Sequence, residues 1–115
     1  MKLREIISNE VIKVSAGGAF DDLESDQVGQ GMLFEATLVS VENRTTAYTR
    51  LTIGVADGLS FQELEEEDSP AADNLYWTPD KIKIPAGKRL RVRLTGCTSG
   101  DDLHLSYQGN LYDVG

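Results

Sequence analysis

Residues 81–94 alternate apolar and basic side chains in two short runs, and this pattern restricts the possible folds more than any other feature of the chain. Successive side chains of a strand point to opposite faces, so each run predicts a strand with one buried face. Residues 85–88 lie between the runs and include proline and glycine, which predicts a turn and hence a β-hairpin. The aliphatic side chains would face a core, and five basic side chains would form the opposite face. They are Lys81, Lys83, Arg89, Arg91 and Arg93.

Similar short runs recur along the chain. Residues 34–42 and 47–55 are rich in Val, Thr, Ile and Tyr and predict a second hairpin, joined through residues 43–46. Residues 2–15 predict two short strands, since Ser8-Asn9-Glu10 can form a turn.

Further turn signals follow towards the C-terminus. Asp57-Gly58 predicts a turn that leads into a short strand over residues 59–64 and then an acidic loop over residues 65–74. Gly109-Asn110 predicts a last turn. Seven to nine short strands separated by such turns predict an all-β fold, an antiparallel, jelly-roll-like β-sandwich.

The chain has 115 residues, which is the size of one domain, so residues 1–115 are expected to form a single β-sandwich. Cys97 is the only cysteine, which excludes an intrachain disulfide and a cysteine-based zinc site within one chain. The first residues lack the apolar run of a secretory signal, and no segment approaches the length of a membrane span. We therefore expect synthesis in the cytoplasm without secretion by a signal peptide, and no membrane partner.

Charge is segregated along the sequence. The net charge is −8, yet residues 81–93 carry six basic side chains and no acidic one, whereas residues 51–80 carry eight acidic and no basic side chains. An acidic protein of this kind is not expected to bind nucleic acid. Instead, the two segments predict attraction between copies or to an acidic partner, weakening as salt rises.

No group of residues has the spacing of a catalytic or metal site. The carboxylate pairs Asp21-Asp22 and Asp101-Asp102, and the acidic run at residues 65–68, do not match a calcium-binding loop, so they are predicted to be solvated. His104 lies between two leucines and is predicted to face solvent at the rim of a sheet, although a small enzyme that pairs it with a carboxylate is one hypothesis. Cys97 is predicted to be a small buried hydrophobe. We expect no enzymatic activity, metal or cofactor.

Aromatic residues suggest a different function. Tyr76, Trp77 and Tyr107 can form a stacking platform, so a carbohydrate- or ligand-binding β-sandwich is the alternative function. Packing of Tyr76 and Trp77 against the acidic loop or a partner is the favoured interpretation, because tryptophan is usually largely buried.

Residues 1–15 contain six aliphatic side chains, which is too many to leave in water. This segment is therefore predicted to be a sheet edge or part of an interface. The aliphatic residues are Leu3, Ile6, Ile7, Val11, Ile12 and Val14. The predicted interface consists of Leu3, Ile6 and Ile7, the five basic residues above, and Tyr76 and Trp77.

Three C-terminal stretches resemble small β-sandwich accessory or decoration proteins of tailed bacteriophage virions. They are Trp77-Thr78-Pro79, the run IKIPAGKRLRV at residues 82–92, and TGCTSGD at residues 95–101, so the resemblance covers residues 75–109. It implies a jelly-roll or immunoglobulin-like fold, a place in the virion, and binding to the major capsid protein or another virion protein. It also implies self-association into symmetric clusters, a trimer being favoured, and no catalytic residue.

Overall fold

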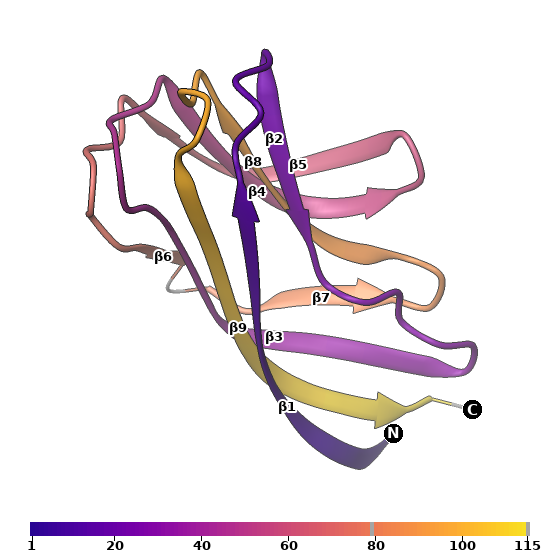
Figure 1. Ribbon diagram of the computed structural model, residues 1–115. Coiled ribbons are helices and arrows are strands. Elements are labelled where there is room, and N and C mark those ends of the chain that lie inside the picture. The colour runs from indigo at the N-terminus through magenta and orange to yellow at the C-terminus, as the bar shows by residue number, and fades with distance from the viewer. Residues whose placement is uncertain (79, 115) are drawn as a thin grey trace.

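The computed structural model describes residues 1–78 and 80–114, and all of their regular structure is β (Figure 1). The strands are β1 (Lys2–Val14), β2 (Phe20–Glu24), β3 (Met32–Asn43), β4 (Arg50–Asp57), β5 (Ser60–Asp68), β6 (Tyr76–Thr78), β7 (Ile82–Pro85), β8 (Arg89–Thr95) and β9 (Asp102–Asp113). Within these ranges there is no helix of the length and apolarity needed to span a membrane.

The nine strands form two antiparallel sheets that pack face to face. Sheet A has the order β1-β9-β3, and the far side of β3 pairs with β7 and then β6 at successive positions. Sheet B has the order β2-β8-β4-β5. The two chain ends lie close together, because Lys2 of β1 is paired with Asp113 of β9 (Figure 1).

The order of pairing defines a jelly roll. Counted from the two ends, β1 pairs with β9, β2 with β8, β3 with β7 and β6, and β4 with β5. The chain is therefore one long hairpin rolled into two sheets, in which β6 and β7 act as a single interrupted strand. The predicted all-β, jelly-roll-like sandwich of seven to nine strands is confirmed.

Both predicted hairpins are wrong. β7 pairs with β3 in sheet A while β8 lies in sheet B, and β3 and β4 are likewise in different sheets. The predicted turn residues do lie where the chain changes direction, but at these turns the chain crosses from one sheet to the other. The tight hairpin is β4–β5, where Asp57 pairs with Ser60. Residues 65–68, predicted to be loop, are part of β5.

The first and last strands are also longer than predicted. β1 is one strand of 13 residues, not two short ones, and β9 runs through Gly109 without a turn. Gly109 is needed because the ring of Phe34 lies against it. A Cβ there would lie 2.8 Å from two ring atoms, and closer still to the carbonyl oxygen of Glu35. Gly109, predicted to be part of a turn, thus lies within a strand, where the absence of a side chain leaves room for the ring of Phe34.

The core fills the space between the sheets with buried side chains from β2, β3, β4, β7, β8 and β9. Phe34 and Tyr107 pack edge to face in it, with ring centroids 6.0 Å apart. Cys97 is buried at one end of the core, as predicted, and burial raises the pKa of its thiol to about 11. The fully buried aliphatic residues are Leu23, Val39, Val41, Leu51, Ile84, Leu90, Val92, Leu94, Leu103 and Leu105.

Two acidic residues predicted to be solvated are buried instead. Asp21 accepts a hydrogen bond from Ser15 Oγ at 2.7 Å and lies 3.4 Å from Lys13 Nζ. Asp101 is 1% exposed, and its Oδ2 accepts from Asn43 Nδ2 at 2.9 Å. Polar partners compensate both carboxylates, as burial of a charge requires, so both are structural groups that fix loops to the sandwich.

Candidate interaction surface

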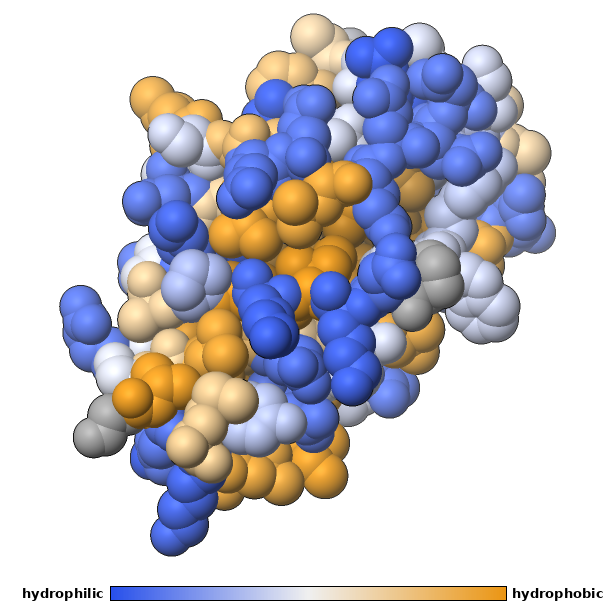
Figure 2. Space-filling view, turned by 180° about the vertical axis from the view of Figure 1, so that it is seen from behind, coloured by the Kyte–Doolittle hydropathy of each residue, from blue (hydrophilic) through white to orange (hydrophobic). Residues whose placement is uncertain are grey.

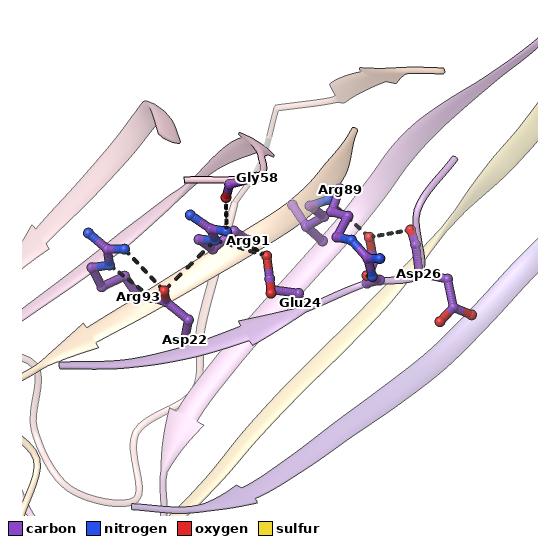
Figure 3. A network of polar contacts seen from close by, with 9 residues as sticks. Asp22, Glu24, Asp26, Gly58, Arg89, Arg91 and Arg93 are labelled. Carbon is purple, nitrogen blue, oxygen red and sulfur yellow. Dashed lines mark hydrogen bonds and ion pairs between the residues drawn. The ribbon is translucent and has the colours of Figure 1, made fainter. Parts of the chain in front are cut away.

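The basic residues of β8 project from the outer face of sheet B, where acidic residues of β2 meet them. Arg93 donates to Asp22 from two nitrogens at 2.8 and 3.0 Å (Figure 3). Arg91 donates to Glu24 Oε2 at 2.9 Å and to the carbonyl oxygen of Gly58 at 2.8 Å. The strand register produces this match, since Asp22 lies opposite Arg93 and Glu24 lies opposite Arg91.

Aromatic rings cover the same arginines. The guanidinium of Arg93 lies 3.9 Å from the ring centroid of Phe20, and that of Arg91 lies 5.4 Å from the centroid of Phe61, both within the range of cation–π attraction. The hydrogen bond from Arg93 to Asp22 raises the pKa of Arg93. Because the side chain of Arg91 is only 9% exposed, these arginines hold sheet B together and offer little free charge to a partner.

The predicted face of five cations is therefore wrong. Arg89, Arg91 and Arg93 belong to sheet B, whereas Lys83 lies on β7 of sheet A and Lys81 just before it. Lys81 and Lys83 are exposed, and Lys81 Nζ lies 4.0 Å from a carboxylate oxygen of Glu35. The sequence did contain a signal for the acidic partners, because Asp22 and Glu24 are spaced by two residues like Arg91 and Arg93.

Strand β1 is an edge of sheet A, as the sequence predicted. It pairs with β9 over its whole length, and among residues 1–78 and 80–114 no strand pairs with its other side. The backbone N–H and C=O groups on that side are therefore available to another strand. At 13 residues, β1 is longer than most strands of globular proteins, which have roughly 3–10 residues.

The aliphatic side chains of β1 divide between its two faces. Ile7 and Val11 are half-buried and pack against the core, whereas Ile6 is 75% and Ile12 60% exposed on the outer face. Leu3 and Val14 are also exposed. Seen from behind, the molecule also has an apolar area in the middle of the face, with hydrophilic residues around it (Figure 2). The exposed aliphatic residues of β1 are therefore not the only apolar surface among the described residues.

A cavity of about 210 Å³ lies between sheet A and the loop that follows β2, beside the middle of β1. Its wall is mainly apolar, and Asn9 of β1 stands at its edge, where Asn9 Nδ2 donates to Tyr107 Oη at 3.3 Å. The apolar wall consists of Ile7, Val28, Met32, Phe34, Tyr107 and Leu111. Part of the inner face of β1, at Ile7 and Asn9, thus borders this cavity.

The three aromatic residues of the predicted platform do not come together. Tyr107 is buried in the core, and Tyr76 is half-buried against it. Trp77 pairs with Ser40 and is 67% exposed, so the acidic loop does not bury it, and its packing against a partner stays a prediction. Tyr76 and Trp77 do border a hollow, together with Leu51, Ile53 and the carboxylates at residues 65–67.

His104 is buried, contrary to prediction, between two carboxylates. Its Nδ1 lies 2.9 Å from Glu10 Oε1, and its Nε2 lies 2.9 Å from Asp102 Oδ1. Burial lowers the pKa of His104, but the contacts with Glu10 and Asp102 raise it by more, so the net shift is upwards. The Glu10 contact thus ties β1 to β9, whereas Nε2 is buried near Asp102 without the geometry of a hydrogen bond.

Across the described ranges, no three His, Cys, Asp or Glu side chains are grouped closely enough to hold a metal ion. The chain matches no known family model, and no curated protein matches it. Among the described residues, the free side of β1 and the exposed side chain of Trp77 are the surface features from which we infer a function.

Proposed function

We propose that this protein is a non-enzymatic structural protein of a bacteriophage particle, which binds the capsid surface and a second copy of itself. The observation that carries the proposal is the long edge strand β1, whose outer face exposes Ile6 and Ile12 and whose free side offers unpaired backbone groups. Exposed apolar side chains beside an open sheet edge are typical of contact surfaces between proteins.

The fold supports the same proposal at a coarser level. Jelly rolls are common among viral capsid and lectin domains, although a fold does not by itself determine a function. The buried polar side chains of Asp21, Asp101 and His104 hold loops and strands in place. This arrangement suits a protein that works by contact.

Cosedimentation tests the proposal. The purified chain is mixed with heads of the phage whose genome encodes it, and we expect it to sediment with them and to saturate at a fixed ratio. The variant with Leu59→Lys is the control, because Leu59 is fully exposed at the β4–β5 turn, far along the chain from β1. If the chain stays in the supernatant at every ratio, the proposed particle function is wrong.

Trp77 favours a second candidate function, the binding of a carbohydrate. It is 67% exposed beside a hollow that contains carboxylates of residues 65–67, and aromatic faces with nearby polar groups bind sugars. Trp77 is the only tryptophan, so its fluorescence reports on this place alone. A glycan array followed by fluorescence titration tests the candidate, and a protein that binds no glycan and whose fluorescence does not respond excludes it.

A further inference from the structure

The free side of β1 lacks two of the devices by which sheet edges avoid pairing with other strands, a proline and a bulge in the middle of the strand. β1 contains no proline, and its single irregularity lies between Leu3 and Glu5, near one end. From Glu5 to Val14 the register with β9 is unbroken. A regular edge of this length can pair with another strand through a continuous ladder of hydrogen bonds.

The side chains of β1 are arranged almost symmetrically about Asn9. In the sequence EIISNEVIK at residues 5–13, positions at equal distances before and after Asn9 mostly carry matching chemistry. Ile6 corresponds to Ile12, Ile7 to Val11, and Glu5 to Lys13. Such symmetry matters because an antiparallel pair of identical strands places these positions directly opposite each other.

The burial of these residues follows the same symmetry. Ile6 and Ile12 are both exposed on the outer face, and Ile7 and Val11 are both half-buried on the inner face. Residues at equal distances from Asn9 share a face, since side chains alternate along a strand. Each exposed isoleucine would therefore meet an exposed isoleucine, and cross-strand aliphatic and opposite-charge pairs are stabilising.

We propose that two copies of this chain form a twofold dimer by antiparallel pairing of their β1 strands, with the axis at Asn9. Ile6 of one copy then faces Ile12 of the second copy, Ile7 faces Val11, and Glu5 faces Lys13. Each of these pairs occurs twice, and the two copies of sheet A join into one continuous sheet. This is an isologous interface of the commonest symmetry among soluble oligomers.

Neighbouring registers match less well. With the axis at Ser8, Ile6 would face Glu10 of the second copy. With the axis at Glu10, the two Glu10 carboxylates would face each other, and like charges directly opposite are destabilising. The charge and apolar pattern of β1 therefore selects Asn9.

Disulfide trapping tests the register. In the Asn9→Cys variant the two introduced thiols lie directly opposite, where Cα atoms of paired strands are about 4.5–5.5 Å apart, within disulfide reach. Ser8→Cys is the matched control, because its two copies would lie diagonally at roughly 7–8 Å. We expect rapid oxidation of Asn9→Cys to a covalent dimer and little from Ser8→Cys or the wild type, whose Cys97 is buried. Equal trapping of both variants would overturn the register.

Light scattering across a range of concentrations tests the dimer itself. The wild type should dimerise, and the double variant with Ile6→Lys and Ile12→Lys should raise the dimer dissociation constant at least a hundredfold, because lysines would then face each other. Both positions are exposed in the single chain, so the variant should keep its fold by circular dichroism, and Leu59→Lys should dimerise normally. A trimer, a wild type that stays monomeric, or a folded double variant that still dimerises would overturn the proposal.

The dimer deepens the self-association in the proposed function but does not depend on a capsid. If the chain dimerises through β1 and fails to sediment with phage heads, the particle function alone is wrong. If the chain sediments with phage heads but is a monomer in light scattering, the proposed dimer alone is wrong.

Discussion

Arg91 of β8 and Glu24 of β2 are joined by a hydrogen bond of 2.9 Å that crosses the outer face of sheet B. The same guanidinium donates to Gly58 in the β4–β5 turn at 2.8 Å. A single cation thus ties the edge strand β2 to the opposite side of the sheet. This is why the basic run of the sequence stabilises the sandwich from within a single chain.

Arg91→Ala is expected to lower the free energy of unfolding by about 2 kcal/mol, because hydrogen bonds between charged groups contribute roughly 1.5–3 kcal/mol when partly buried. Urea denaturation followed by circular dichroism measures the change. Lys83→Ala is the matched control, since Lys83 is exposed, and surface substitutions usually change stability by less than about 0.5 kcal/mol. Equal effects of the two variants would contradict a structural role for Arg91.

Asp101→Asn is expected to destabilise the protein at neutral pH by roughly 2 kcal/mol, the cost of disrupting buried hydrogen bonds to a charged group. Oδ2 of Asp101 accepts from Thr46 Oγ1 at 2.6 Å, Thr98 N at 2.7 Å and Asn43 Nδ2 at 2.9 Å. Burial raises the pKa of Asp101, but these hydrogen bonds lower it by more, and the net shift is downwards.

The lowered pKa of Asp101 fixes the direction of its pH dependence. A carboxyl with a depressed pKa in the native state contributes stability above its ordinary pKa of 3.8, and this contribution is lost as pH falls through the native value. The gap in stability between wild type and Asp101→Asn should therefore narrow in acid. Asp57→Asn, at an exposed turn position, serves as control and should show no such gap at neutral pH.

Gly109→Ala is expected to be strongly destabilising, because the added Cβ would collide with the ring of Phe34 and with the backbone of Glu35. Relief of such a clash requires backbone shifts in β3 and β9, and overpacking of a core typically costs about 1–3 kcal/mol. Gly18→Ala is the control, since a Cβ added at Gly18 would have no other atom within 4 Å. Thermal melts compare the two variants, and a Gly109→Ala protein that melts like Gly18→Ala would contradict the close packing of Phe34.

The fold class was predictable because alternation and turn residues are local signals. Alternating runs such as residues 89–94 identify strands, and their number and spacing identify a sandwich. Pairing is not local. The chain does reverse at residues 85–88, as predicted, but whether β7 and β8 pair or separate into two sheets depends on strands far away in the sequence.

The candidate interaction surface was predicted only in part, because some of its features are local in the sequence and others depend on strand pairing. The six aliphatic residues of the N-terminal segment predicted an edge or interface, and β1 is an edge. The prediction of a free basic face was wrong because Asp22 and Glu24 come from a segment more than sixty residues away in the sequence. Only the register of β2 with β8 brings these carboxylates to Arg91 and Arg93. The prediction for His104 failed because Glu10 of β1 and Arg44 after β3, both distant in the sequence, lie beside its ring.

His104 is expected to titrate above its ordinary pKa of 6.5. The charged groups beside it are Glu10 on β1, Asp102 on its own strand, Glu42 opposite it on β3, and Arg44 after β3, whose positive charge opposes the shift. A histidine with a raised native pKa contributes stability that is fully present below its unfolded pKa and is lost as pH rises through the native value. The difference in unfolding free energy between wild type and His104→Gln should therefore become smaller in alkaline solution.

As the only histidine, His104 can be followed directly by NMR. Glu10→Gln should move its titration midpoint downwards, and a wild-type midpoint at or below 6.5 would contradict the ion pair between β1 and β9.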